Sequence, residues 1–357
     1  MSTNDLIHVK QDDTRYSELR KQARVKLQDA VPLAGPLSVY VEPTNICNFR
    51  CKYCPESFEN FEEESGGRFK LNNDDFELIA REIENIGTVK TLNFYMMGEP
   101  FGNKNLLGYI TRIKERGAVD RVIVTSNGSL LKPSLHAGIC ASGLDYLRIS
   151  IYGAFEETHR ARTGSAIKLE RIKGYLAALK NYRDNLGLNF PQIYIKMIEV
   201  SDPLENKAFL SEFSPLGDEV CIEPVMNWND PKEGNLSQMN TLDLLATPHF
   251  AHRKDVCPFP FYTLVIHSDL KVSVCCVDWN KKIVVGDLRK QSLDQIWRGT
   301  SLNYVQRIHI ERRRGQLESC RDCTYIHTAP DNLDSLSMDE FYKRINSRGS
   351  RIESKEL

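Results

Sequence analysis

Three cysteines lie close together early in the chain, at positions 47, 51 and 54. They belong to the segment Glu42-Pro-Thr-Asn-Ile-Cys-Asn-Phe-Arg-Cys-Lys-Tyr-Cys-Pro55, which directly follows an apolar run. Thiolates are the usual protein ligands of iron–sulfur clusters. Three of them hold three irons of a 4Fe–4S cube and leave the fourth iron open to a small chelating molecule. Structural zinc is the alternative, but it usually takes four protein ligands, and no fourth Cys or His lies nearby.

A second set of cysteines follows late in the chain, with the spacing Cys257-x17-Cys275 and Cys320-x2-Cys323. The residues between them predict a β-hairpin, a short amphipathic helix and a knuckle that ends in the Cys-x2-Cys pair. The same pattern suits an iron–sulfur cluster or a zinc ribbon. Cys275 and Cys276 are adjacent, so on a strand they point to opposite faces and only one can be a ligand.

The elements that must position these cysteines alternate along the chain between apolar runs and amphipathic stretches. Six runs predict strands: Ser38–Val41, Thr91–Met97, Arg121–Thr125, Tyr146–Ile151, Gln192–Val200 and Glu219–Ile222. Five stretches predict helices: Asp74–Ile86, Leu106–Arg116, Pro133–Ala141, Ala166–Tyr182 and Leu204–Phe213. Asn73 and Asp74 are candidate N-caps, and Gly87, Gly117 and Gly143 stand where helices should end. Alternating strands and helices predict an α/β fold with a parallel sheet, here a partial (β/α)6 barrel.

In a parallel barrel the chemistry gathers at the carboxyl ends of the strands. The candidate residues fall there in order. The cysteine loop follows the first strand, and the later positions are Met97-Gly98-Glu99-Pro100, Thr125-Ser126-Asn127-Gly128, Ser150, Arg162 in the loop after the fourth strand, Lys196, and Glu223-Pro224. Lys196, Glu199 and Glu223 all lie near the predicted mouth as possible general bases, and a one-residue slip in register would turn each of them away.

The three-cysteine motif with an aromatic residue before its last Cys resembles the radical S-adenosylmethionine (radical SAM) superfamily. The resemblance implies that SAM binds the open iron of a 4Fe–4S cluster held by Cys47, Cys51 and Cys54. Gly98-Glu99-Pro100 resembles the Gly-Gly-Glu motif that accepts the SAM ammonium, with Met97 in place of one glycine. Ser150 resembles the hydroxyl that contacts the ribose, and Arg162 the arginine that meets the SAM carboxylate. Ser126 and Asn127 are further candidate contacts to the cofactor or the substrate.

The second cysteine set resembles the SPASM/twitch extension of the same superfamily, which binds auxiliary clusters. Four cysteines, Cys257, Cys275, Cys320 and Cys323, match the shorter twitch form with one auxiliary 4Fe–4S cluster, because no cysteine follows Cys323. Leu270 stands where a glycine usually precedes the hairpin cysteine. The family spacing favours Cys275 over Cys276 as the ligand.

The resemblance implies that a 5′-deoxyadenosyl radical made from SAM abstracts hydrogen from a small substrate. Removal of a hydrogen atom, a proton and an electron, with the auxiliary cluster as electron acceptor, would oxidise an alcohol of a carbohydrate-like or nucleotide-linked molecule. A SPASM-type peptide- or protein-modifying maturase, a redox-neutral epimerase and a zinc-stabilised binding module that is not an enzyme are the alternatives. An electron donor such as flavodoxin or ferredoxin is the expected protein partner.

The composition limits the remaining partners. The chain has 357 residues, with 47 basic and 48 acidic side chains, so its charge favours neither nucleic acid nor an anionic membrane. The polar amino-terminal sequence, ten cysteines and no long apolar run predict a cytoplasmic protein. The expected organisation is an extension (1–36), a radical SAM barrel (37–226), a linker (227–256), the auxiliary cluster domain (257–326) and a charged tail (327–357).

Overall fold

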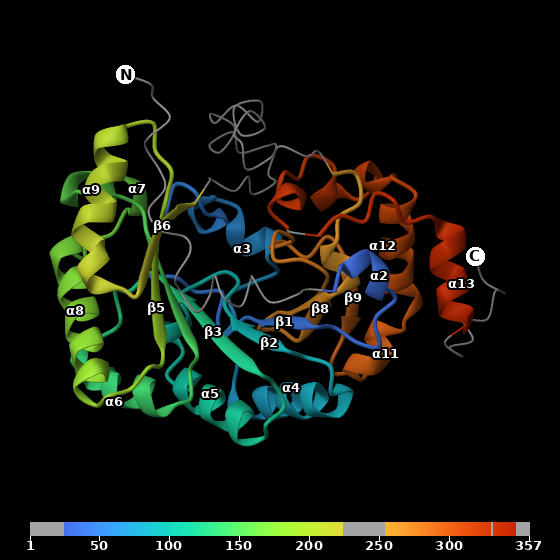
Figure 1. Ribbon diagram of the computed structural model, residues 1–357, viewed down its shortest axis with the longest axis horizontal. Helices are drawn as coiled ribbons and strands as arrows, with labels where there is room; N and C mark the ends of the chain where they lie inside the picture. Colours follow the sequence, from blue (N-terminus) through green and yellow to red (C-terminus); the bar gives the residue numbers. More distant parts are fainter. Residues whose placement is uncertain (1–24, 224–253, 330, 348–357) are drawn as a thin grey trace.

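The computed structural model of the chain describes residues 25–223, 254–329 and 331–347 (Figure 1). Within these residues one curved sheet runs through the molecule, with its strands in the order β6-β5-β4-β3-β2-β1-β7-β8-β9. The strands are β1 Ser38–Val41, β2 Thr91–Phe94, β3 Arg121–Ser126, β4 Tyr146–Ile151, β5 Gln192–Ile198, β6 Glu219–Glu223, β7 Thr263–Ile266, β8 Lys271–Ser273 and β9 Val284–Asp287.

The first six strands are parallel and unclosed, which confirms the predicted partial barrel. The sheet does not stop at β1, because β7 pairs with β1 in parallel from Ser38↔Thr263 to Val41↔Ile266. β8 and β9 then continue it in antiparallel fashion. The predicted carboxyl-terminal hairpin is therefore an extension of the barrel sheet, and this brings the second cysteine region to the side of the barrel's first strand.

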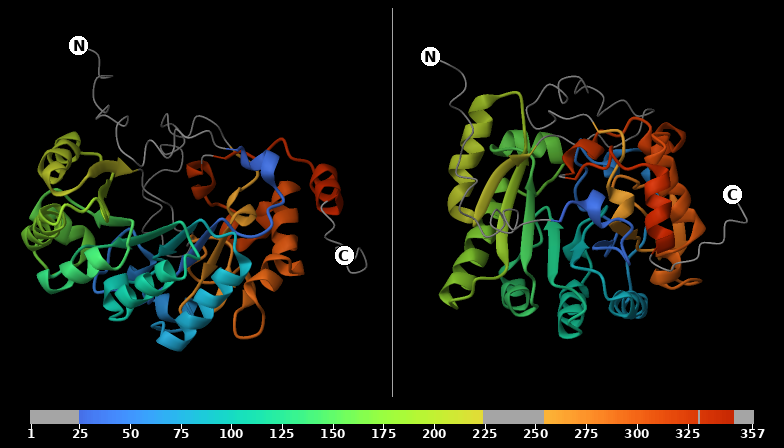
Figure 2. Two further views of the ribbon diagram at one scale, coloured as in Figure 1. Left: turned by 60° about the horizontal axis from the view of Figure 1, so that its bottom comes forward. Right: turned by 45° about the vertical axis from the view of Figure 1, so that its right-hand side comes forward.

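Helices cover the outer, convex side of the sheet (Figures 1 and 2). Those that alternate with the parallel strands are α4 Asn73–Ile86, α5 Leu106–Glu115, α6 Pro133–Ala141, α7 Glu156–Thr163, α8 Leu169–Asn185 and α9 Pro203–Phe213. The short helix α3 Phe61–Glu64 lies apart from them, with the ring of Phe61 stacked on Trp279 (Figure 1). α11 Leu293–Trp297 and α12 Thr300–Ile310 follow β9 and pack against it.

Alternation along each strand separates an apolar outer side from a more polar inner side. On β4, Leu147, Ile149 and Ile151 are buried beneath the helices, whereas Arg148 and Ser150 are half-buried on the inner side. The strand sequences thus supply a core on one face and functional groups on the other.

One predicted helix boundary was wrong by a residue or two. The side chain of Asn72, rather than that of Asn73 or Asp74, caps α4 by accepting a hydrogen bond of 2.9 Å from the Asp75 amide. Gly87 ends the helix in the left-handed conformation, as its position predicts.

The described ends of the chain form a small second core. α2 (Leu27–Ala30) packs with α13 (Met338–Ser347), and buried side chains of this core include Leu27, Phe341 and Ile345. Residues 338–347 are therefore a packed helix, which differs from the charged tail expected there. The expected linker falls largely outside the described residues.

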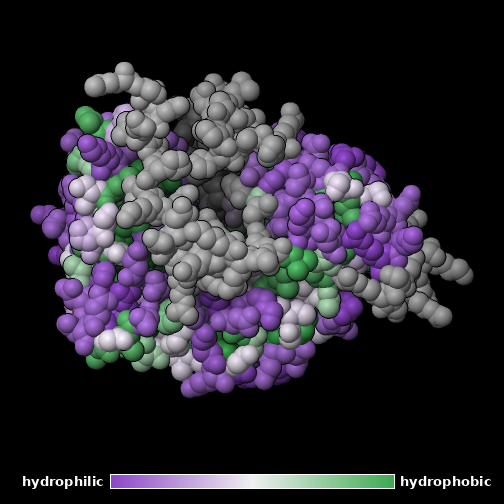
Figure 3. Space-filling view, in the orientation of Figure 1, coloured by the Kyte–Doolittle hydropathy of each residue, from purple (hydrophilic) through white to green (hydrophobic). Residues whose placement is uncertain are grey.

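Charged and polar side chains dominate the described surface in Figure 3, with only small hydrophobic groups between them. None of the helices in the described ranges is both long enough and apolar enough to cross a lipid bilayer.

Candidate active site and auxiliary cluster site

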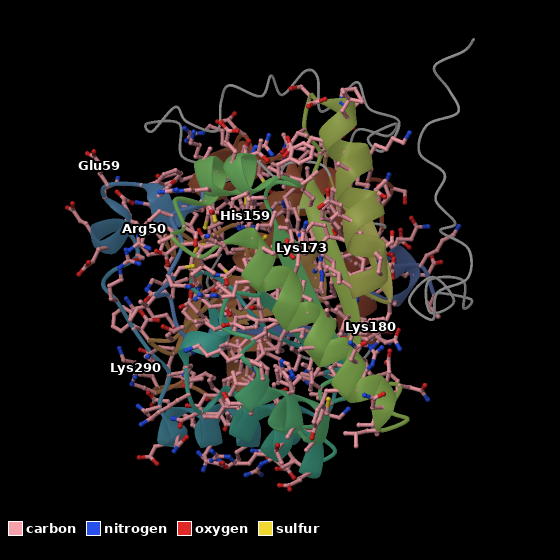
Figure 4. All side chains as sticks on the ribbon, turned by 90° about the vertical axis from the view of Figure 1, so that its left-hand side faces the viewer. Arg50, Glu59, His159, Lys173, Lys180 and Lys290 are labelled. Atoms are coloured by element: carbon pink, nitrogen blue, oxygen red, sulfur yellow. The ribbon has the colours of Figure 1, made fainter. Side chains whose placement is uncertain are left out.

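The loop that carries the first three cysteines leaves β1 and is fixed from two sides. Its backbone amides at Arg50 and Lys52 donate hydrogen bonds to the carbonyls of Thr163 (2.9 Å) and Arg162 (2.8 Å) at the end of α7. Within the loop, the Arg50 guanidinium donates a hydrogen bond to the Cys47 carbonyl at 3.0 Å. Figure 4 shows Arg50 on this loop, beside the helix that carries His159. The loop is thus held by α7 as well as by its own strand.

The three thiols are inside the protein rather than on its surface. Cys51 is 7% exposed, and Cys47 and Cys54 are half-buried. Burial raises the pKa of Cys47 to about 11 and that of Cys54 to about 12. Buried thiols of this kind become thiolates only when positive charge is placed beside them, as metal ions do. The donor set therefore fits a cluster with three protein ligands, and its iron would lower these pKa values.

Gly98, at the end of β2, packs directly on the start of the cysteine loop. Its φ is +75°, and a Cβ atom there would lie 2.3 Å from the Thr44 carbonyl oxygen and 2.8 Å from the Ile46 amide nitrogen. Only glycine fits such a contact without displacement. The next amide, at Glu99, donates to the Ile46 carbonyl at 3.1 Å. The end of β2 and the cysteine loop therefore form one rigid unit.

The Glu99 carboxylate points into the protein and joins the ends of two strands. It accepts hydrogen bonds from the Ser126 hydroxyl (2.7 Å), the Asn127 amide (2.8 Å) and the Phe101 amide (3.1 Å). Burial raises its pKa to about 7, although these three donors oppose the shift. Glu99 and Ser126 thus meet, as their predicted positions at neighbouring strand ends require, and the Glu99 side chain braces the site.

Asn127 reaches from β3 to the cysteine loop. Its amide group donates to the Asn48 side chain at 2.9 Å and lies 3.9 Å from the Cys47 sulfur. Among the predicted cofactor contacts, Asn127 is thus the one that the structure places against a cysteine ligand.

Ser150 and Arg162 occupy different surroundings. Ser150 lies half-buried on the inner side of β4, opposite Lys196 in the strand register. Arg162 lies within α7, not in a loop, and its guanidinium binds both carboxylate oxygens of Glu205 at 2.7 and 2.8 Å. A contact of Arg162 with the SAM carboxylate remains a prediction, and in this structure its planar fork is engaged by Glu205.

The structure adds a polar group that the sequence pattern did not single out as a unit. On the inner side of β4, β5 and β6, the Glu223 carboxylate binds Arg148 (3.1 Å), Lys196 (2.6 Å) and the Tyr194 hydroxyl (2.9 Å). We call these four residues the inner-face cluster. Of the three possible general bases, Lys196 and Glu223 belong to this cluster, whereas Glu199 is exposed. Arg148 and Tyr194 were not among the predicted site residues. The available signal was a charged or polar side chain at alternate positions of otherwise apolar strands.

The inner-face cluster fixes the charge of its carboxylate. Burial alone would raise the pKa of Glu223, but the ammonium of Lys196 and the guanidinium of Arg148 outweigh it and lower the pKa to about 2. Glu223 is therefore ionised at neutral pH and is a weak proton acceptor while both cations hold it.

The second cysteine set converges in the folded chain. Cys257, Cys275, Cys320 and Cys323 line one cavity, although they come from three separate segments. Cys276 lies outside this cavity and is 5% exposed in an apolar cluster with Tyr40 and Trp279. The arrangement favours Cys275 over Cys276 as a ligand, in agreement with the family spacing.

Polar side chains also line this cavity, among them His309 and Arg314. His309 of α12 is 1% exposed, and its Nε2 lies 3.7 Å from the Cys320 sulfur. Arg314 donates to the backbone carbonyls of Cys320 and Cys323. Across the described part of the chain, no three His, Cys, Asp or Glu side chains converge on a point as ligands of a single metal ion do. Four thiols around one cavity fit a cluster whose irons are all ligated by protein.

One packed apolar cluster connects the two cysteine sites. It contains Tyr40, Met97, Cys276 and Trp279, and it packs against Cys54 on one side and against Cys275 and Cys323 on the other. Tyr40 and Tyr95 form an edge-to-face pair with ring centroids 5.2 Å apart within this region. One apolar cluster of side chains therefore packs against cysteines of both sites.

Comparison with known families agrees with this geometry. The Radical SAM superfamily model matches residues 41–191, and the model of an iron–sulfur cluster-binding domain, SPASM, matches residues 257–324. The two matches together span more than half of the chain, and the chain belongs to the radical SAM superfamily. SAM and a 4Fe–4S cluster are accordingly its cofactors, and the carboxyl-terminal region is an iron–sulfur region.

Individual relatives are more distant. A probable GTP 3′,8-cyclase of Saccharolobus islandicus is 31% identical over 183 residues, which are 49% of this chain and 56% of that protein. The chain thus matches little more than half the length of this relative. A crystal structure of BtrN in complex with AdoMet and 2-DOIA is similar in fold, with a TM-score of 0.54, 16% identity, and coverage of 85% of this chain and 97% of that one. Native anSMEcpe with bound AdoMet and the Cp18Cys peptide gives a TM-score of 0.56, 13% identity, and coverage of 88% and 98%.

Proposed function

We propose that this protein is a radical SAM oxidoreductase that oxidises an alcohol carbon of a small carbohydrate-like or nucleotide-linked substrate. Cys47, Cys51 and Cys54 would hold the SAM-binding cluster, and Cys257, Cys275, Cys320 and Cys323 an auxiliary 4Fe–4S cluster. When bound, these groups supply the one-electron chemistry that removes a hydrogen atom from carbon and carries an electron away. The observation that carries the proposal is the four-cysteine cavity, whose cysteines pack against the same apolar cluster as the three-cysteine loop.

The residues of the chain orient the reaction and keep water out. Gly98 and Glu99 lock the end of β2 to the cysteine loop, and Asn127 fixes that loop from β3. We assign Gly98, Glu99, Ser126, Asn127, Ser150 and Arg162 as the residues that hold SAM or support those that do. Tyr40, Met97 and Trp279 exclude water between the two cysteine sites. An alcohol-to-ketone oxidation removes one hydrogen atom, one proton and one electron, and a fully ligated auxiliary cluster suits the last of these.

The names of the relatives mention both small molecules and peptides, the two candidate classes of substrate. The name of the Saccharolobus islandicus relative contains a nucleotide, and the BtrN structure contains a small molecule, 2-DOIA. The anSMEcpe structure contains a peptide, so peptide modification is the second candidate function. An electron donor such as flavodoxin or ferredoxin is the proposed partner, and a cytoplasmic location remains a prediction.

Transfer of deuterium from a labelled substrate separates the two functions. The reconstituted protein would be incubated without oxygen with SAM, a reductant, and either carbinol-deuterated sugars and nucleosides or a deuterated peptide. The proposal expects deuterium in 5′-deoxyadenosine from an alcohol substrate, together with a ketone product that requires intact Cys320 and Cys323. Deuterium transfer from the peptide alone would contradict it and establish the maturase.

A further inference from the structure

The inner-face cluster is more open than the ion pairs that hold the fold together. The side chains of Arg148, Lys196 and Glu223 are 26%, 25% and 30% exposed. In the Arg162–Glu205 pair the carboxylate is 3% exposed, and in the Arg183–Asp218 pair the guanidinium is 4% exposed. The first of these pairs joins α7 to α9, and the second joins α8 to the residue before β6. The inner-face cluster is instead accessible on the concave side of the sheet, where a ligand can reach it.

Arg148 from β4 and Lys196 from β5 converge on one carboxylate, that of Glu223. The ring of Tyr194 lies beneath the Arg148 guanidinium, 5.4 Å away, and its hydroxyl donates to the same carboxylate. Glu219 is on the same side of β6 but nearer its amino end, level with Tyr194. Two cations thus meet at a position that accommodates a carboxylate.

The cluster also lies beside the predicted SAM site. Lys196 is opposite Ser150 in the strand register. Tyr152, half-buried just beyond the end of β4, stacks on Tyr53 of the cysteine loop with ring centroids 6.2 Å apart, so the strand that carries Arg148 and Ser150 leads directly to that loop. A substrate held by the cluster would therefore lie within the same part of the barrel as the reacting end of the cofactor.

We propose that Arg148 and Lys196 bind an anionic group of the substrate, a carboxylate or a phosphate, for which the Glu223 carboxylate holds the place in the free protein. The inference rests on the proposed function, because it assumes that the substrate enters this barrel, and it adds the charge of that substrate. Arginine and lysine together suit such a group, since the guanidinium offers a planar fork and the ammonium a point charge. Glu223 then acts as a competitor that keeps both cations in position until the anion arrives.

Relaxation of small probe ions by the paramagnetic first cluster tests this directly. The full-length protein would be reconstituted, loaded with S-adenosylhomocysteine, which has no sulfonium to be cleaved, then reduced and titrated separately with inorganic phosphate, acetate and methylammonium. Phosphorus NMR relaxation of phosphate and proton NMR relaxation of the two organic ions report which of them binds near the cluster. Variants Lys196→Met and Glu223→Gln are compared with Lys290→Met, whose parent side chain is 78% exposed.

The proposal expects opposite effects from the two cluster variants. Lys196→Met should weaken phosphate or acetate binding at least about tenfold, because a hydrogen bond to a charged group is worth about 1.5–3 kcal/mol. Glu223→Gln should strengthen binding of the same ion, since the internal competitor loses its charge, and Lys290→Met should change nothing. Preference for phosphate or for acetate identifies which anion the substrate carries.

Two results would overturn the inference. One is methylammonium relaxation that disappears in Glu223→Gln, which would make the carboxylate the binding group. The other is anion relaxation that is absent, or equal in wild type and both cluster variants. Neither result bears on deuterium transfer to 5′-deoxyadenosine, so a failure here is distinguishable from a failure of the proposed oxidation.

Discussion

The two cysteine sites of this protein are assembled in different ways. The first takes its three thiols from one short loop that follows a single strand, whereas the second gathers four thiols from the segments around Cys257, Cys275 and Cys320–Cys323. The first site is therefore defined by local sequence, and the second exists only once β7 has paired with β1 and the knuckle has folded back. The difference also separates their expected roles, because three ligands leave an iron open and four do not.

The largest expected effect comes from removing the first site. A Cys47→Ala/Cys51→Ala/Cys54→Ala variant should lose SAM cleavage completely, because the open iron has no other protein ligands nearby. Formation of 5′-deoxyadenosine under reducing conditions measures this. Cys140→Ala, a half-buried cysteine of α6, is the matched control and should keep full cleavage. Cleavage that survives in the triple variant would disprove the assignment of the first site.

Removal of the second site should separate cleavage from product formation. In Cys320→Ala/Cys323→Ala the first site is untouched, so SAM should still be cleaved, while the oxidised product is lost for want of an electron acceptor. The ratio of product to 5′-deoxyadenosine is the quantity to follow. An unchanged ratio in a variant shown to lack the auxiliary cluster would mean that the second site is structural, and a redox-neutral reaction such as epimerisation would then fit better.

The bracing of the first site by α7 gives a smaller, thermodynamic effect. Arg162→Met leaves the Glu205 carboxylate, 3% exposed, without its cation. Loss of one partner of a buried ion pair costs roughly 3–5 kcal/mol of unfolding free energy. Urea unfolding of the apo chain should show this loss, and the added change Glu205→Gln should recover much of it. An unfolding curve of Arg162→Met equal to that of wild type would contradict a stabilising role for the Arg162–Glu205 pair.

The smallest expected effect is a pH dependence of stability that Glu99 gives to the first site. Burial raises the pKa of Glu99 from 4.5 to about 7 in the folded chain, so the fold binds an extra proton between these values. The contribution of Glu99 to the free energy of unfolding is therefore largest below about pH 4.5 and decreases as the pH rises to about 7. The total decrease is about 3 kcal/mol. Unfolding free energies of wild type should show this decline relative to Glu99→Gln. Parallel pH profiles for the two proteins would contradict the buried, braced carboxylate.

The sequence predicted much of the barrel because each parallel strand carries a short apolar run next to a helix-forming stretch. β1, β4 and α6 have the predicted bounds, and the polar residues after each strand meet at the expected edge. Long-range pairing was not readable in this way. Nothing local in Thr263–Ile266 says that this strand pairs with β1, and nothing local in α13 says that Phe341 and Ile345 find partners in Leu27 and Val256.

The candidate site likewise has parts that the local sequence predicts and parts that depend on long-range pairing. The three-cysteine loop and the Glu99–Ser126 contact follow from residues placed at strand ends, which a parallel sheet brings together. The inner-face cluster depends on register between β4, β5 and β6, where a shift by one residue would turn Arg148 or Lys196 into the helix layer. The choice between Cys275 and Cys276 depends similarly on which side of the hairpin faces the knuckle.

The most direct test of two unlike iron–sulfur sites is a count of iron and labile sulfide per chain after anaerobic reconstitution. Two 4Fe–4S clusters would give about eight irons in wild type. About four should remain in each of the two cysteine variants, the triple change at Cys47, Cys51 and Cys54 and the double change at Cys320 and Cys323. About four irons in wild type, falling to none in the triple variant with zinc bound elsewhere, would contradict the auxiliary cluster and with it the proposed electron acceptor.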